Sequence, residues 1–475
     1  MERDGLRRSL EKMDAMNGGS SKPVNRVTRR GFLKRGVTLA AAVGFPYVVP
    51  SSVFGTAAPG NRITMGCIGV GGMGTNDMRA FLALDDVQVL AVCDVVTGSR
   101  EYGHWYTNGW QGNYLGRVPA QKIVDNHYGS VKPSGTFKGC SAYVDFRELL
   151  ARDDIDAVTI VTPDHWHAVM SIMAAKAGKH IYCEKPMTLT VVEGRAMVEA
   201  VRRHNVVFQT GSHERSRAVT RFACELVRNG RIGRLKKITA IVGPNNRTAP
   251  GSDWKPMPIP DGFDYDLWLG PAPWQPYHKD RCLYKFRFLL DYSGGQTTNL
   301  GAHSLDMAQW ANGTDYTGPV EVEDLGGEFP KDGLFTAPVN INFRMRYAND
   351  VELVCKTDVS QWVGARFEGT DGWVQIAKTL QTYPESLKNS VIGPNEIHLY
   401  RSSNHHRNLI DCIKNGGETA APVEVGHRSA TLCHLGNIAM MLKRKLQWDP
   451  QTERFTNDDH ANKMLDRPRR APWHI

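Results

Sequence analysis

The sequence lacks the patterns that mark several classes of protein. Its nine cysteines include no C-x-x-C pair, so neither a zinc site nor a disulfide framework is indicated. It has no tract of low complexity and no repeat of fixed period, and its composition is that of an ordinary globular protein. Because 475 residues are too many for one ordinary domain, we expect two domains with extensions.

The chain also has little net charge outside its amino-terminal segment. The whole sequence carries +9, but residues 1–58 hold ten Lys and Arg against four Asp and Glu and so supply +6 of it. The rest of the chain, near +3, gives no reason to expect a nucleic-acid partner.

An export signal is predicted in this basic segment. Residues 28–34, Thr-Arg-Arg-Gly-Phe-Leu-Lys, reproduce the twin-arginine motif. The apolar run at residues 37–49 is shorter than the about 20 residues of a membrane-spanning helix. We expect residues 1–57 to be signal peptide and linker, the twin-arginine export machinery to be a partner, and the protein to be periplasmic or otherwise exported. An uncleaved anchor or arm is the alternative.

Residues 63–94 predict a strand, a turn, a helix and a second strand. The turn fits G-x-G-x-x-G: Gly69 permits a tight turn, Gly71 lets a pyrophosphate approach the backbone, and Gly74 allows close packing of helix on strand. The start of the helix then offers unpaired N–H groups to the anion. The predicted cofactor-binding turn comprises Gly69, Gly71, Gly72, Met73 and Gly74.

Asp94 indicates which dinucleotide binds. It lies 20 residues after Gly74 at the end of the second strand, where its carboxylate can accept hydrogen bonds from ribose hydroxyls. The same charge would repel a 2′-phosphate, which favours NAD, while the nearby Arg100 keeps NADP as the alternative. Export of a folded protein away from free NAD predicts that the nucleotide is tightly bound.

The sequence from 58 to 210 alternates apolar strands with helices and predicts an α/β Rossmann domain with a doubly wound parallel sheet. After Asp94, a Gly-, Tyr- and Trp-rich segment is predicted to be an insertion over the site. Strands are expected at residues 155–161, 181–183 and 206–210, and helices at 119–127, 145–150, 166–177 and 191–204.

Three further motifs carry a family resemblance. With the glycine turn, they are Thr162-Pro163-x-x-x-His167, Glu184-Lys185-Pro186 and residues 290–306, LDYSGGQTTNLGAHSLD. Together they resemble the glucose-fructose oxidoreductase and inositol dehydrogenase family (Gfo/Idh/MocA) over residues 60–470. The resemblance implies cofactor contacts by Thr162, Pro163, His167 and Glu184.

The resemblance also implies a second domain, 211–475, an α+β unit with a large, mostly antiparallel sheet. Its open face would form a homo-oligomer, and a helical tail over residues 404–446 would return to the first domain. The pattern agrees with a helix at residues 218–229 and strands at 235–242, 339–347, 351–357 and 372–377.

Lys185 and His303 are the candidate catalytic residues. A lysine at the carboxyl end of a parallel strand faces the crevice where ligands of open α/β sheets bind, and its ammonium can stabilise an alcohol oxygen. His303 suits proton transfer near neutral pH. The family's usual aspartate four residues earlier is Asn299 here, so another acid orients His303, or Lys185 is the base.

The remaining histidines are less clearly assigned. His213 is predicted to line the substrate crevice with Lys185, Asn299 and His303, or else to be structural. His405, His406 and His427 have no metal-like spacing with a nearby acid or cysteine, so no metal is expected.

We therefore predict an exported NAD-dependent oxidoreductase that transfers hydride between nicotinamide and a ring carbon of a sugar, glycoside or cyclitol. The first alternative is a glycoside-cleaving enzyme of the same fold, which oxidises, eliminates and then reduces with the same NAD. The second is a non-catalytic sugar-binding protein with a vestigial nucleotide site.

Overall fold

The fold is described from a computed structural model over residues 61–103, 114–130, 135–244, 251–360 and 363–475. The predicted export signal and most of the predicted insertion lie outside these residues. No helix in the described part of the chain combines the length and the apolar character needed to cross a membrane.

The first sheet is parallel throughout and has the order β3-β2-β1-β4-β5-β6. Its strands are short and almost wholly buried, as expected for a sheet covered on both faces. This confirms the predicted doubly wound Rossmann fold. The strands are β1 (Ile63–Ile68), β2 (Val87–Cys93), β3 (Ser141–Tyr143), β4 (Ala157–Ile160), β5 (His180–Cys183) and β6 (Phe208–Thr210).

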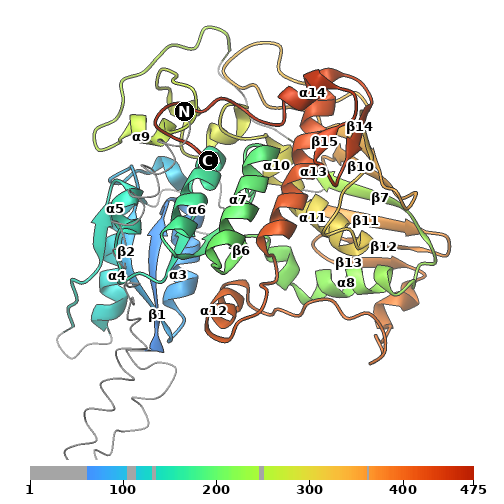
Figure 1. Cartoon of the computed structure of the whole chain (residues 1–475), viewed down its shortest axis with the longest axis horizontal. Coiled ribbons are helices and arrows are strands. Elements are labelled where there is room, and N and C mark those ends of the chain that lie inside the picture. The colour runs from blue at the N-terminus through green and yellow to red at the C-terminus, as the bar shows by residue number, and fades with distance from the viewer. Residues whose placement is uncertain (1–60, 104–113, 131–134, 245–250, 361–362) are drawn as a thin grey trace, which may run out of the picture. The chain divides into compact units, whose positions relative to one another are not determined.

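Helices cover both faces of this sheet (Figure 1). One face packs against α5 (Phe146–Leu150), α6 (Asp164–Lys176) and α7 (Val191–His204). The other packs against α3 (Gly72–Leu82), α4 (Arg117–Ser130) and, from much later in the chain, α12 (His405–Asn415). A short 3₁₀ turn, η3, spans Glu101–Gly103.

Local sequence explains where these helices begin and end. Thr190 and Glu193 form a reciprocal capping box that starts α7, and Asn205 ends it in the left-handed conformation, so its bounds match the prediction. Asp145 caps α5 by accepting a hydrogen bond from the backbone of Arg147.

The second sheet has nine strands in the order β13-β12-β11-β7-β10-β9-β8-β14-β15. The β7–β10 pair is parallel and the other pairs are antiparallel, so the expected mostly antiparallel sheet is present. Its strands are β7 (Leu235–Val242), β8 (Glu321–Asp324), β9 (Asn342–Arg346), β10 (Glu352–Thr357), β11 (Val363–Gly369), β12 (Trp373–Ile376), β13 (Leu380–Tyr383), β14 (Leu446–Asp449) and β15 (Arg454–Phe455).

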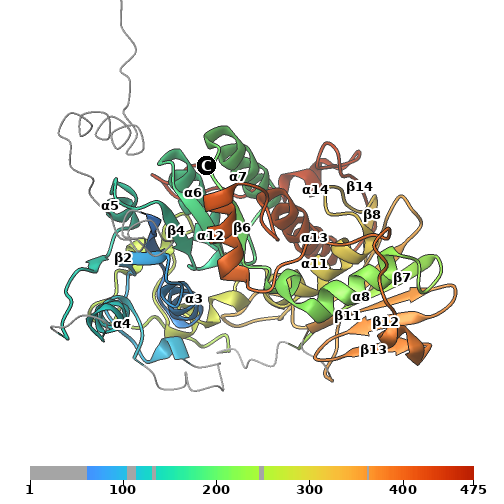
Figure 2. The same cartoon turned by 90° about the horizontal axis from the view of Figure 1, so that it is seen from below.

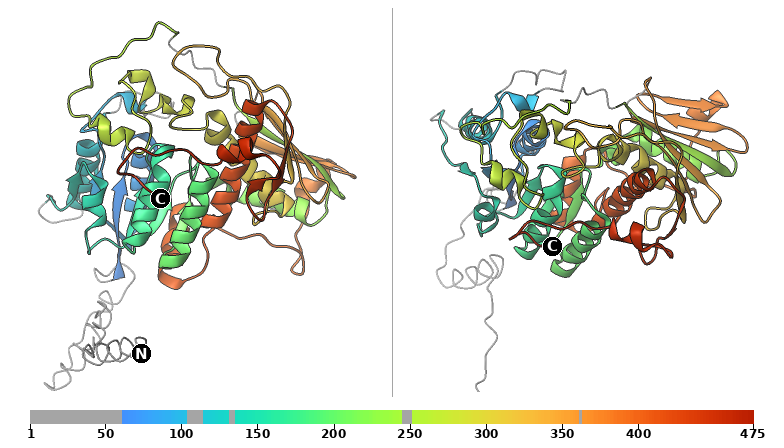
Figure 3. Two further views of the ribbon diagram at one scale, coloured as in Figure 1. Left: turned by 45° about the horizontal axis from the view of Figure 1, so that its top comes forward. Right: turned by 90° about the horizontal axis from the view of Figure 1, so that it is seen from above.

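Helices lie on one face of this sheet, on the side of the Rossmann domain (Figure 3). They are α8 (Ala218–Arg228), α11 (Gly301–Asn312) and α13 (Val423–Leu442). The remaining short elements are η4 (His213–Ser216), α9 (Tyr265–Leu269), η5 (Lys279–Arg281), η6 (Lys285–Phe288), α10 (Gln296–Asn299), η7 (Glu385–Asn389) and α14 (Asp459–Lys463).

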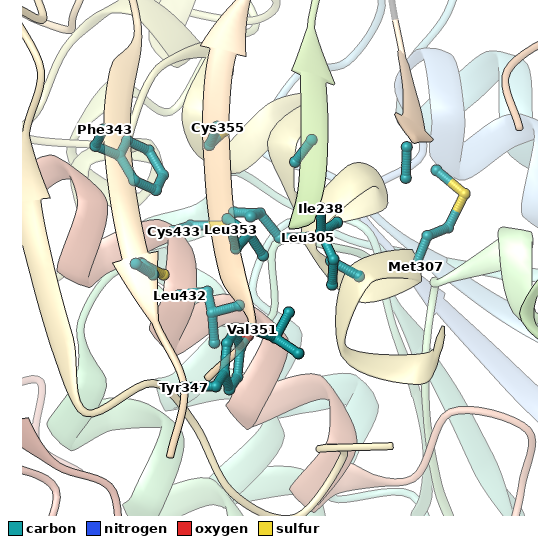
Figure 4. Packing of buried hydrophobic residues seen from close by; sticks show 14 of the residues in the cluster. Ile238, Leu305, Met307, Phe343, Tyr347, Val351, Leu353, Cys355, Leu432 and Cys433 are labelled. Carbon is teal, nitrogen blue, oxygen red and sulfur yellow. The ribbon is translucent and has the colours of Figure 1, made fainter. Parts of the chain in front are cut away.

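The core of the second domain forms between these helices and the strands (Figure 4). Leu305 of α11 lies beside Ile238 and Leu353 of the sheet, and all three are buried in one cluster with Leu432 of α13 and Phe343. The long helices are thereby fixed against the sheet.

Several strands of the second sheet do not follow from the sequence pattern. Strand β11 carries Arg366 and Glu368 on its open face, which breaks a purely apolar run. The predicted helical tail is wrong at its end: Lys443 adopts a left-handed conformation after Leu442, and the chain turns into β14. The apolar Leu446 is thus a strand residue.

Candidate active site

One cavity of about 710 Å³ lies where β1, β2, β4 and β5 end. Parallel strands place their carboxyl ends at one edge of a sheet, and ligands of such folds bind there. Residues of η6, α10 and the start of α11 close it from the second domain. Every residue predicted for cofactor or substrate lines this cavity: Gly69, Gly71, Gly72, Met73, Gly74, Asp94, Thr162, Pro163, His167, Glu184, Lys185, His213, Asn299 and His303.

The glycine turn at one end of the cavity leaves no room for a side chain at Gly69 or Gly74. Gly69 has φ +79°, and a Cβ there would lie 2.5 Å from the carbonyl oxygen of Val161. A Cβ on Gly74 would lie 1.8 Å from the carbonyl oxygen of Gly69. Helix α3 then starts without a side-chain cap and without an acid in its first turn. Its first N–H groups are suited to an anion such as a pyrophosphate.

Asp94 is held rigidly beside this turn. One carboxylate oxygen accepts a hydrogen bond from the backbone N–H of Val70 at 2.9 Å, and the other accepts from that of Val96 at 2.9 Å and from the hydroxyl of Tyr102 at 2.8 Å. Burial raises the pKa of Asp94, and these donors oppose that shift. The oxygen that accepts from Val70 has a second lone pair, which a ribose hydroxyl can use. The turn, the helix start and Asp94 together fit a dinucleotide.

Tyr102 is a residue of this site that sequence reasoning missed. A Cβ on Gly71 would lie 2.6 Å from its ring, so the ring covers the turn at its second glycine. The aromatic composition of the insertion was the available signal, but composition does not say which tyrosine reaches Asp94.

Lys185 stands at the end of β5 with its amine directed at the second domain. Its Nζ donates to the carbonyl oxygen of Asn299 at 2.8 Å and to the side-chain oxygen at 3.2 Å. Burial lowers the pKa of Lys185, the charge of Glu184 opposes this, and the charge of Arg287 lowers it further. The amine is therefore closer to losing its proton at neutral pH than an ordinary lysine.

The Glu184 carboxylate contacts polar groups of three other residues. Its carboxylate accepts from the backbone N–H of Lys185 at 3.0 Å, from the hydroxyl of Tyr182 at 3.3 Å, and contacts the Nε2 of His213 at 3.3 Å. Burial would raise the pKa of Glu184, but the hydrogen bond and charge of His213 bring it down to about 2. The pKa of His213 is raised in return, although burial opposes this.

His303 has a neutral ring in the cavity. Burial and the charge of Lys185 lower its pKa to about 3. Within the described residues the ring makes no hydrogen bond, because Asn299 directs its side-chain oxygen at Lys185 and its amide nitrogen at Gln296, 2.8 Å away. The geometry thus leaves the His303 ring available to a substrate.

His167 holds the two strand ends together. One ring nitrogen lies 2.7 Å from the carbonyl oxygen of Pro186 and the other 2.8 Å from that of Thr162. Only a doubly protonated ring donates to two carbonyls. The pKa of His167 is about 9 despite the opposing effect of burial, because the Cys183 thiol and the Asp164 carboxylate nearby favour the cation. Both ring nitrogens are used within the protein.

Arg287, also missed from the sequence, adds a guanidinium charge to the cavity lining. Its guanidinium lies over the rings of Tyr284 and Phe286, 4.5 and 4.6 Å from their centroids, and donates to the carbonyl oxygen of Tyr284 at 2.9 Å. It forms no ion pair with any carboxylate in the described ranges. Its other N–H groups are available to substrate oxygens.

Two family models match the chain. Residues 63–212 match the oxidoreductase family NAD-binding Rossmann fold, and residues 237–475 match the oxidoreductase family C-terminal alpha/beta domain. The chain is 31% identical over 224 residues to Glycosyl hydrolase family 109 protein 2 of Shewanella sp. strain ANA-3. That match covers 44% of this chain and 44% of the relative's length.

Solved structures share the fold. An aldose-aldose oxidoreductase from Caulobacter crescentus, complexed with glycerol, aligns with a TM-score of 0.56 at 19% identity, covering 81% of this chain and 99% of that one. The WlbA dehydrogenase from Bordetella pertussis, in complex with NADH and UDP-GlcNAcA, aligns with a TM-score of 0.56 at 16% identity, covering 82% and 99%. With both of its domain models matched across most of the described residues, the chain belongs to the Gfo/Idh/MocA oxidoreductase family.

Proposed function

We propose that this protein is an NAD-dependent oxidoreductase that acts on a hydroxyl of a sugar, glycoside or cyclitol. The observation that supports this most is the position of Lys185. It lines the same cavity as the glycine turn and is held by both oxygens of Asn299. When bound, NAD supplies the nicotinamide carbon that accepts or returns hydride.

Lys185 is the proposed proton acceptor for alcohol oxidation. A neutral amine has two N–H groups, which the two oxygens of Asn299 accept, and one lone pair, which remains for the substrate hydroxyl. In the oxidation direction Nζ would take the hydroxyl proton of the substrate, while bound NAD would supply the hydride acceptor and the alcohol would become a ketone. In the reverse direction the Lys185 ammonium returns that proton to the developing alkoxide.

His303 is proposed to orient the substrate by accepting a hydrogen bond. A ring with a pKa of about 3 is neutral at pH 7 and is a weak base. Lys185 is therefore better suited to take the proton. Asn299 positions the Lys185 amine and does not orient His303.

The function is tested by nucleotide content and turnover. Denaturing the purified protein is expected to release near-stoichiometric NAD, identified by mass spectrometry and absorbance. Lys185→Met is expected to lower turnover at least about 100-fold while NAD stays bound. The exposed Lys176→Met at the end of α6 is the control. Full turnover in both Lys185→Met and His303→Gln would refute the assigned roles, and protein that binds no nucleotide would favour a non-catalytic sugar-binding protein.

Glycoside cleavage is the second candidate, favoured by the similarity to a glycosyl hydrolase family 109 protein. Oxidation of a ring carbon would acidify the neighbouring C–H, and elimination would break the glycosidic bond, with the aglycone leaving as it gains a proton. Water would then add across the new double bond, and reduction of the ketone with the same NAD would close the cycle. Release of free aglycone with no net change in NADH would support this candidate over a simple dehydrogenase.

Export and homo-oligomer formation are also proposed. The twin-arginine motif at residues 28–34 supports export with NAD already bound, which a reporter fusion in strains with and without that pathway tests. The open face of the nine-stranded sheet carries cross-strand charge pairs, such as Lys237–Glu352 at 3.8 Å. If it joins two copies, ionic strength will weaken their association in analytical ultracentrifugation.

A further inference from the structure

Three side chains from distant segments meet behind Glu184. Asp77 comes from α3, His213 from η4 and His406 from α12. Each offers one ligand atom, and these atoms all lie within 4.8 Å of one another. Helix α12 packs against α3 at this point (Figure 2).

The Asp77 carboxylate is buried with no lysine or arginine paired to it in the described part of the chain. Its side chain is 1% exposed, and one oxygen lies 2.9 Å from the Nε2 of His406. Its other oxygen has no hydrogen-bond partner in the described ranges. A buried carboxylate is stable only when it is paired, protonated or bound to a metal.

The neighbouring groups supply a compensating charge only in part: burial and the charge of Glu184 raise the pKa of Asp77, and the charge of His213 lowers it. Burial and the charge of His213 lower the pKa of His406 to about 4, so its ring is neutral at pH 7. His213 pairs with Glu184, a second buried acid whose charge acts on Asp77. The cluster therefore holds two carboxylates and two imidazoles, and the imidazole of His406 is neutral.

We propose that Asp77, His213 and His406 bind a divalent transition-metal ion, with zinc as the best chemical match. Two imidazoles and a carboxylate are a common zinc donor set, with bonds of about 2.0–2.2 Å. A tetrahedral shell with such bonds places its ligand atoms about 3.4 Å apart, so small side-chain rotations close the site. Glu184 and Tyr182, which contact the His213 ring at 3.3 and 2.9 Å, orient it from outside.

The ion would be structural. It joins the helix that starts at the nucleotide turn to α12 and to the segment beside Lys185. Asp77 lies within the packed core and does not line the cavity. Of the three ligands only His213 lines the cavity, so the metal would stabilise the nucleotide domain and fix the His213 ring at the cavity wall.

Metal binding is tested on the tag-free chain stripped with EDTA. Competition against a chromophoric chelator is expected to show one zinc per chain, and zinc is expected to raise the thermal unfolding temperature by several °C. Asp77→Asn and His406→Gln should each weaken zinc binding at least about tenfold. Cobalt(II) should give visible d–d absorption in the wild type and lose it in His406→Gln.

The controls separate a lost ligand from a damaged fold. His460→Gln changes an exposed histidine on α14 and should bind zinc like the wild type. Metal-free Asp77→Asn should unfold at a higher temperature than the metal-free wild type, because it removes the buried carboxylate. If the wild type and both ligand variants bind zinc equally, or the wild type binds none, Asp77 and His406 form only a hydrogen-bonded pair and the proposal is wrong.

Discussion

Asn299→Asp should move the pH dependence of catalysis, because it places a carboxylate beside Lys185. The Nζ of Lys185 lies 3.2 Å from the side-chain oxygen that would become charged. A unit charge pair at that distance interacts by about 5 kcal/mol at an effective dielectric constant of 20, and desolvation of the new carboxylate offsets part of this. Raising the pKa of Lys185 by about one to two units is the expected net effect.

The direction of the shift in the pH profile follows from the proposed role of the Lys185 amine as the base. Oxidation needs neutral Lys185, so kcat/KM for oxidation rises as pH rises through its pKa. The variant should shift this acidic limb upward by about one to two pH units and lower kcat/KM about 10- to 100-fold below it. At high pH the two enzymes should converge. In the reducing direction the alkaline limb should shift upward, because the ammonium persists to higher pH.

The assay is a pH profile of kcat/KM in both directions with NAD saturating. Asn349→Asp, an exposed change in a turn of the second domain, is the control and should leave the profile unchanged. Repeating Asn299→Asp in a His303→Gln background shows whether Lys185 or His303 is the group whose titration sets the limb. If the limb stays in place in Asn299→Asp, or moves only when His303 is present, Lys185 is not the group that titrates.

Three further predictions follow from single contacts. Arg287→Gln should shift the same acidic limb upward by less than Asn299→Asp does, since it removes a positive charge that lowers the pKa of Lys185, and a downward shift would contradict this. Tyr102→Phe should tighten NAD binding a few-fold in calorimetry, because it frees a lone pair of Asp94 for the ribose, and weaker binding would mean that Tyr102 helps to hold the nucleotide. Leu353→Ala in the second core should lower the free energy of unfolding by about 2–5 kcal/mol in urea denaturation, whereas Val359→Ala at an exposed position should leave it nearly unchanged.

The Rossmann domain could be predicted from sequence because each of its signals is local. The glycine turn, the Thr190 and Glu193 capping box and the short buried strands each act within a few residues. The second sheet is harder to predict, since its strands have one polar face and pair across long separations. Strand β14, for example, joins β8 through Leu446 and Val322, and no local pattern indicates that pairing.

For the candidate site, the residues could be predicted from the sequence but their contacts could not. Lys185, Asn299 and His303 lie in motifs, so their presence at one cavity could be expected. Their hydrogen bonds could not be predicted. The side-chain oxygen of Asn299 accepts a hydrogen bond from Lys185, and both ring nitrogens of His167 contact backbone carbonyls. Sequence spacing predicted no metal, whereas Asp77, His213 and His406 meet only through the fold.

The nucleotide domain is not complete in the first half of the chain. Leu409 and Ile410 of α12 are fully buried in the same cluster as Met78 and Phe81 of α3. Asp86, just after α3, pairs with Arg407 at 2.5 Å and with Lys414 at 2.6 Å, and these partners lower its pKa to about 2 although burial opposes this. Residues from beyond position 400 therefore complete one face of the first sheet. The helix that starts at the glycine turn is held by α12, so the position of this turn depends on a segment from the second half of the chain.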